Sequence, residues 1–251
     1  MPIIRGWTDA QRTPRTNLRL GATLAFVAGA ANAGGFLAVG QYTSHMTGVV
    51  SSAADHLVLG EWLLAGAALA SLATFVAGAM CTALLVNWGQ RRNLHSCYSL
   101  PLLIEAGFLM LFGLMGASLG QHSALLLPAT VLLLCFIMGL QNAVITKISR
   151  AEIRTTHVTG LATDLGIELG KLMYVNRNDA LAQVRANRDR MRTHGLLIGC
   201  FFVGGLLGAL GFKWVGYITT LPLALLLLLL CLKPLWRDFN EHVARPRSAA
   251  P

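Results

Sequence analysis

The stretch Thr43-Ser44-His45-Met46-Thr47-Gly48 recurs later in the chain as Thr155-Thr156-His157-Val158-Thr159-Gly160. Each copy follows a long apolar segment, and the distribution of basic residues places the two copies on opposite faces of a membrane. Repeats that run in opposite directions are typical of small-solute transporters, in which two polar helix ends meet inside the bilayer. The repeat therefore predicts an inverted-repeat membrane fold, although it does not specify a solute.

The composition places the chain in lipid. Hydrophobic residues make up 55% of the 251 residues and charged residues only 12%, whereas soluble domains are about a quarter charged. Apolar stretches long enough to cross a hydrocarbon core of about 30 Å cover residues 20–40, 62–87, 99–119, 123–146, 195–213 and 215–233. We expect an all-α integral membrane protein with about six transmembrane helices and the lipid bilayer as its main partner.

The net charge of +9 reflects membrane orientation. With both termini in the cytoplasm, 19 of the 20 Lys and Arg residues lie in cytoplasmic segments, and Lys213 is the exception. This follows the positive-inside rule, so the basic charge does not indicate a nucleic-acid partner. We expect a multi-pass protein with two cytoplasmic termini.

The spans divide into two membrane repeats, residues 20–120 and 121–236, with three spans each. An odd number of crossings inverts the second copy relative to the first. A cytoplasmic segment, 1–19, precedes the repeats, a cytoplasmic tail, 237–251, follows them, and the second repeat contains a cytoplasmic loop, 171–194.

A short stretch follows each copy of the phrase. Residues 47–60 and 159–172 would form helices of about 21 Å, too short to span. We expect half-helices that begin inside the membrane after an unwound turn and are capped by side-chain oxygens of Thr47 and Thr159 or of the residues just before them. Helices lying flat at the interface are the alternative. Non-helical backbone at membrane depth normally lines a cavity, and free helix-start amides favour an anionic or strongly hydrogen-bonding ligand.

The candidate site residues fall into two groups. Those expected to bind the solute or line its pathway come from the two phrases and from the spans before them: Asn32, Thr43, His45, Thr47, Gly48, Asn142, Thr155, His157, Thr159 and Gly160. The two asparagines either satisfy the broken backbone or contact the solute. Ionisable groups that are candidates for proton or ion coupling are Asp55, Glu105, Asp164 and Glu168. Solvation of Asp164 and Glu168 at the cytoplasmic face, and pairing or packing of Glu105, are the alternatives.

The sequence assigns no metal and no cofactor. Two His residues without a third convergent ligand do not define a metal site, and the spacing of the five cysteines matches no zinc or redox motif. The small residues of the segment 195–213 favour close helix contacts, either within one chain or in a homodimer. The leading hypothesis is a small-solute secondary transporter. The alternatives are a non-transporting sensor or assembly module and an intramembrane enzyme.

The chain resembles the YoaK family of bacterial membrane proteins, which is grouped as domain of unknown function 1275. The resemblance covers about residues 18–233 and is carried by GGFLAVGQYTSHMTGVVSSAADHLVLG, residues 34–60, and by GLQNAVITKISRAEIRTTHVTGLATDLGIELG, residues 139–170. Where relatives have Asn on either side of the first Met-Thr-Gly, this chain has His45 and Val49. The resemblance implies about six spans in the bacterial inner membrane and supplies no substrate.

Overall fold

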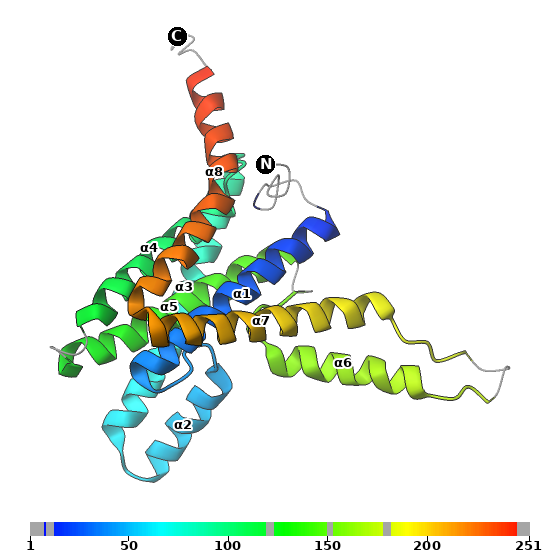
Figure 1. Cartoon of the computed structure of the whole chain (residues 1–251), viewed down its shortest axis with the longest axis horizontal. Coiled ribbons are helices and arrows are strands. Elements are labelled where there is room, and N and C mark those ends of the chain that lie inside the picture. The colour runs from blue at the N-terminus through cyan, green and yellow to red at the C-terminus, as the bar shows by residue number, and fades with distance from the viewer. Residues whose placement is uncertain (1–7, 9–12, 119–122, 150–152, 178–181, 245–251) are drawn as a thin grey trace.

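The computed structural model describes residues 8, 13–118, 123–149, 153–177 and 182–244. The predicted boundary between the repeats near residue 120, most of the amino-terminal segment and residues 245–251 lie outside this part. The described chain is helical (Figure 1). Its elements are α1 (Pro14–Val39), α2 (Met46–Val58), α3 (Trp62–Arg91), α4 (Ser99–Ser118), α5 (Ser123–Ser149), α6 (Val158–Met173), α7 (Arg188–Trp214), the 3-10 turn η1 (Gly216–Thr219) and α8 (Thr220–Ala244).

Within the described residues, 6 helices are long and apolar enough to cross a membrane. They are α1, α3, α4, α5, α7 and α8, and each coincides with an apolar stretch of the sequence. Two apolar helices, α2 and α6, are shorter, with 13 and 16 residues. The prediction of an all-helical membrane protein with about six spans is therefore confirmed.

The connection between α6 and α7 covers residues 174–187 and is shorter than the predicted loop 171–194. Helix α6 continues to Met173, and α7 already begins at Arg188. The early start has a local cause, because the Asn187 side chain accepts hydrogen bonds from the amides of Asp189 and Arg190, at 3.1 Å each. This side-chain cap satisfies amides that would otherwise lack partners and extends α7 beyond its apolar part.

The long helices pair between the two predicted halves of the chain. Helix α1 packs along α7, α5 packs along α3, and α4 packs against α8. Glycines allow the closest of these contacts: a Cβ added at Gly29 of α1 would overlap the carbonyl oxygen of Phe201 in α7, and one added at Gly139 of α5 would overlap that of Phe75 in α3. The reverse contacts also exist, since a Cβ at Gly204 would overlap Phe26 and one at Gly78 would overlap Phe136.

The close contacts of α7 are thus made inside one chain. Gly204 and Gly208 face backbone atoms of Phe26 and Ala30 in α1. Small residues let helix backbones approach in lipid, where packing rather than hydrophobic burial holds helices together. Of the two uses that the sequence left open for these glycines, the intramolecular one therefore accounts for Gly204 and Gly208.

The two short helices leave the centre of the molecule separately. Figure 1 shows α2 forming a hairpin with the start of α3 at one end of the protein, while α6 runs beside α7 at another. Helix α2 packs on α3, which pairs with α5 from the second half of the chain. Helix α6 packs on α7, which pairs with α1 from the first half. This arrangement leaves the amino ends of α2 and α6 facing the middle of the molecule.

Candidate functional site

The repeated phrases form the amino-terminal starts of α2 and α6. Helix α2 begins at Met46 with His45 as its N-cap residue, and α6 begins at Val158 with His157 in the same position. The backbone angles of the two caps match closely, with φ −92° and ψ 68° at His45 and φ −85° and ψ 57° at His157. Neither helix has a side-chain cap hydrogen bond, so the expectation that Thr47, Thr159 or the residues just before them cap the helices is wrong.

The side-chain caps are missing because the neighbouring hydroxyl groups form hydrogen bonds elsewhere. Each hydroxyl immediately before the N-cap histidine bonds an asparagine of the preceding helix. Ser44 donates from Oγ to Asn32 Oδ1 at 3.0 Å and from its amide at 3.4 Å. Thr156 Oγ1 donates to Asn142 Oδ1 at 2.8 Å. The two asparagines therefore hold the unwound turns against α1 and α5, and Asn32 also accepts a hydrogen bond from the backbone of its turn.

Each glycine of the phrase lies under its histidine ring. A Cβ added at Gly48 would overlap the ring of His45, and one added at Gly160 would overlap the ring of His157. The glycines are thus required for ring packing, because the imidazole folds back over the first turn of the helix. This contact fixes the orientation of both rings at the helix starts.

First-turn amides of both short helices remain available, except that of Met46, which donates to the carbonyl oxygen of Ser44 at 3.2 Å. The first backbone hydrogen bonds of the helices are given by Val49 to the carbonyl of His45 and by Leu161 to the carbonyl of His157, each at 3.1 Å. The amides that precede Val49 and Leu161 in each helix have no helical acceptor. An uncapped helix start carries partial positive charge and free donors, both of which favour an anion or a hydrogen-bond acceptor.

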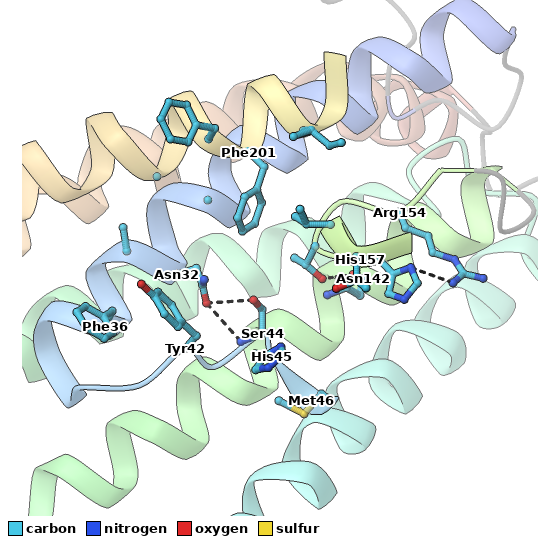
Figure 2. Close-up of a pocket in the computed structure, with 18 of the residues that line it drawn as sticks. Asn32, Phe36, Tyr42, Ser44, His45, Met46, Asn142, Arg154, His157 and Phe201 are labelled. Atoms are coloured by element: carbon cyan, nitrogen blue, oxygen red, sulfur yellow. Dashed lines mark hydrogen bonds between the residues drawn. The ribbon is translucent and has the colours of Figure 1, made fainter. Parts of the chain in front are cut away.

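Both helix starts line one cavity of about 1180 Å³. Its lining includes His45 and Thr47 from the first phrase, His157 and Thr159 from the second, and both asparagines, Asn32 and Asn142. Most of the remaining wall is apolar and comes from five helices or their flanks: Gly29, Ala33, Phe36, Leu37, Tyr42, Met46, Phe75, Val158, Ile198, Phe201, Phe202, Gly205, Leu206 and Ala209. Figure 2 shows the Asn32–Ser44 and Asn142 contacts side by side beneath Phe201.

The two ends of the cavity differ in chemistry although their backbones match. Arg154 precedes the second phrase, and its Nη1 lies 3.3 Å from Nδ1 of His157. Because guanidinium can only donate, Nδ1 accepts and the ring proton of His157 resides on Nε2. At the matching place before the first phrase stands Tyr42, which stacks on Phe36 with ring centroids 4.7 Å apart. Among the lining residues that the structure describes, Arg154 carries the one full charge.

None of the four acidic candidates lines this cavity. Asp55 and Asp164 are exposed on the short helices. Glu168 accepts hydrogen bonds from Lys171 Nζ at 2.7 Å and from the amide of Asn187 at 2.6 Å, and these bonds hold its pKa below the ordinary value. Glu105 is completely buried in α4, and neither carboxylate oxygen has a hydrogen-bond partner in the described part of the chain.

Four further candidates from the phrases also lie off the cavity wall. Thr43 and Thr155 are buried, with hydroxyls that bond no described residue, and Gly48 and Gly160 lie beneath the histidine rings. Sequence reasoning missed Tyr42, Ser44, Arg154 and Thr156, although all four belong to or directly precede the phrases and proximity to the repeat was an available signal. It also missed Phe201, which reaches the cavity from α7 and has no local signal in the sequence.

No group of three or more His, Cys, Asp or Glu side chains suited to a metal ion occurs in the part of the chain that the structure describes. The side chains that face the cavity are donors, aromatic rings and aliphatic groups. What the arrangement offers is therefore binding chemistry for a small organic molecule, through free amides, hydroxyls, two imidazoles and one guanidinium.

Six helices that are long and apolar enough to cross a membrane define a multi-pass membrane protein, and four of them, α1, α3, α5 and α7, contribute to the wall of the partly polar cavity. A family model described as a protein of unknown function, DUF1275, matches residues 20–232. The chain belongs to the DUF1275 family. No curated protein and no solved structure matches it.

Proposed function

We propose that the protein is a small-solute secondary transporter or permease, and that the cavity between the starts of α2 and α6 is its solute chamber. The single observation that supports this most strongly is that His45 and His157, which lie 112 positions apart in the sequence, line the same cavity from two uncapped helix starts. Broken helices whose amino ends face a shared site are the usual way in which secondary transporters present donors to a solute at membrane depth.

The two halves of the chain are proposed to be inverted repeats. The matched N-cap angles, the paired hydrogen bonds to Asn32 and Asn142, and the two glycine–histidine contacts support this symmetry. The helix pairs between the two halves support it too, since α1 contacts α7 in the way that α5 contacts α3. In this arrangement α2 and α6 are re-entrant half-helices that open toward opposite faces of the membrane, and both termini are cytoplasmic.

The proposal is tested by aqueous labelling of single cysteines at the two unwound turns. Ser44→Cys and Thr156→Cys are made in a chain whose five native cysteines are replaced by Ala. The protein is reconstituted in one orientation, and a membrane-impermeant maleimide is added to one side at a time. Since both positions lie next to the cavity, we expect reagent to reach each of them from one side, with opposite sides for the two positions.

The matched control is Leu225→Cys, because this α8 side chain is 56% exposed on a membrane-spanning helix and should face lipid. It should stay unlabelled from both sides. If the cysteines at positions 44 and 156 are equally inert, no water-filled path reaches the chamber, and the protein is instead a non-transporting membrane module. Solute flux in proteoliposomes under a proton or sodium gradient then measures transport itself.

Glu105 is the proposed proton-coupling residue. A carboxylate buried in a membrane helix without a partner is costly when ionised, so such groups are usually functional. Since α4 contacts α5 and α5 lines the chamber, proton exchange at Glu105 would act on the chamber through α5. Glu105→Gln keeps the volume and removes the titratable group, so we expect proton-driven solute flux to fall at least tenfold while exchange without a gradient persists. Equal loss of both modes would show that Glu105 has a structural role.

A further inference from the structure

We propose that the chamber binds an amphipathic organic anion in one orientation, with its carboxylate-type head group at Arg154 and His157 and its apolar body toward Phe36, Tyr42 and Phe201. This inference rests on the proposed solute chamber and names the class of solute. It depends on a chemical difference between the two ends of the cavity. This difference lies in the side chains, because the backbones of the two phrases match.

One end of the cavity is cationic. Arg154 stands beside the start of α6, and the first-turn residues Val158 and Thr159 line the same wall. No lining residue that the structure describes is acidic, so the guanidinium has no carboxylate partner on this wall. A guanidinium favours planar, two-oxygen anions because its donors form a fork that matches them. A solute anion would supply the missing counter-charge.

His157 strengthens this assignment. Its Nδ1 lies 3.3 Å from Nη1 of Arg154, which positions the guanidinium and directs the ring proton to Nε2. His157 is exposed and lies on the cavity wall, so Nε2–H is available as a further donor. Figure 2 shows Arg154, His157 and Asn142 gathered at this end.

The other end is aromatic. Phe36 and Tyr42 stack with ring planes 17° apart, and both rings line the cavity at the start of the first phrase. Figure 2 places this pair on the far side of Asn32 from Arg154, with Phe201 of α7 above the space between the two ends. The tyrosine that occupies the place of Arg154 thus replaces a charge with a flat apolar surface.

The wall between the ends excludes simpler ions as the preferred ligand. Phe75, Phe201, Phe202 and Leu206 present apolar surface, which a fully hydrated inorganic anion cannot use. The cavity of about 1180 Å³ is somewhat larger than ordinary small-molecule sites, which have volumes of about 300–1,000 Å³. A head group alone would leave most of this space empty, whereas an anion with an aromatic or alkyl body would bury its apolar surface there.

Binding of three probes to the full chain in lipid nanodiscs tests the inference. The probes are biphenyl-4-carboxylate, its neutral amide, and acetate, with affinities measured by titration calorimetry. We expect the biphenyl carboxylate to bind more tightly than the amide and acetate. Arg154→Gln should weaken its binding by about tenfold or more, the scale of a lost charge-assisted contact, and leave the amide unchanged. Arg154→Lys keeps the positive charge but cannot contact both carboxylate oxygens. Its affinity for the biphenyl carboxylate should therefore lie between those of the native chain and of Arg154→Gln.

Matched variants separate charge from apolar contact. Arg185→Gln removes the same charge from an exposed site away from the cavity and should change nothing. Tyr42→Ala should weaken the binding of the biphenyl carboxylate and leave the binding of acetate unchanged. Decanoate, added as a fourth probe, distinguishes an alkyl from an aromatic body: tighter binding of decanoate than of the biphenyl compound assigns an alkyl-chain anion, and the reverse assigns an aromatic one.

Equal affinity for the carboxylate and its amide, or an Arg154→Gln variant that binds the carboxylate as well as the native chain, would overturn the anion assignment. If maleimide still reaches the cysteine at position 156 in that case, the chamber stands and only the solute class is wrong. If the probes fail to bind and positions 44 and 156 are also unreachable, both the inference and the proposed function fail.

Discussion

At the scale of single residues, the Thr-Gly endings of the two phrases serve the histidines rather than the backbone turn. Gly48 and Gly160 each have negative φ and belong to the first turn of a helix, so their backbone conformation does not require glycine. What requires it is space, because a Cβ at either position would overlap the ring of the N-cap histidine. The His and the Gly three positions later therefore form a local packing unit, a ring over a glycine, that occurs once in each phrase.

This packing unit leads to a prediction for Gly160→Ala. The added methyl group must push the exposed His157 ring away and separate it from Arg154, and this displacement offsets part of the helix propensity that Ala gains over Gly. Thermal unfolding in detergent should therefore occur at a lower temperature than for the same substitution at Gly166, where no ring is displaced.

The matched control is Gly166→Ala in the same helix, where a Cβ would meet nothing within 4 Å. Because Ala is the better helix former by about 1 kcal/mol, this variant should be neutral or stabilising. If both variants unfolded at the same temperature, the ring contact would carry no weight in stability.

At the scale of elements, α6 is fastened to α7 through one carboxylate. Glu168 receives hydrogen bonds from Lys171 of its own helix and from the amide of Asn187, the N-cap residue of α7. The carboxylate therefore joins the last part of α6 to the start of α7 across the connection between them. This structural use competes with the ion-coupling role that its position after the second phrase had suggested.

The joint has a definite pH dependence. The hydrogen bond from Lys171, followed by the one from the Asn187 amide, holds the pKa of Glu168 below its ordinary value near 4.5. A group whose pKa is lower in the folded than in the unfolded chain stabilises the fold above the unfolded pKa and ceases to do so as the pH falls through the folded value. Glu168→Gln should therefore lower the melting temperature at pH 7, and the gap from the native chain should shrink as the pH drops below about 4.

Asp164→Asn supplies the comparison for this prediction, because Asp164 is an exposed carboxylate on the same helix. Its removal should leave the melting temperature at pH 7 close to that of the native chain. A Glu168→Gln effect that persists unchanged at acidic pH would mean that the ionised carboxylate does not form the joint.

At the scale of the whole molecule, the two halves of the chain are interlocked. The main helix pairs, α1 with α7, α3 with α5 and α4 with α8, each join one half to the other. Each half alone would therefore leave its glycine-lined surfaces without partners. In lipid, such surfaces gain their stability from close backbone contact with a matching helix.

We accordingly predict that neither half is stable alone. A chain divided within residues 119–122 and expressed as separate halves should yield proteolysed or aggregated fragments, whereas co-expressed halves should purify as a 1:1 complex through a tag on one of them. The undivided tagged chain is the control for yield. Two halves that each purify as monodisperse proteins and do not associate would contradict the interlocked arrangement.

The sequence by itself determined the helices, their lengths and the membrane environment. A chain in lipid must satisfy its backbone internally, so apolar runs of sufficient length become spanning helices regardless of their neighbours. The sequence also marked the two helix starts, because the His and Gly that form each packing unit are close along the chain. It misjudged the caps, since nothing local shows that Ser44 and Thr156 bond asparagines of the preceding helices.

Only the tertiary structure decided that the two starts share one cavity. Their meeting depends on how α1 packs on α7 and α5 on α3, through contacts between residues far apart in the sequence that no local pattern encodes. The same packing brings Phe201 and Phe75 to the wall and sets Tyr42 against Arg154 at opposite ends of it. Periodicity and hydropathy act along the chain, whereas the chemistry of this chamber arises between helices.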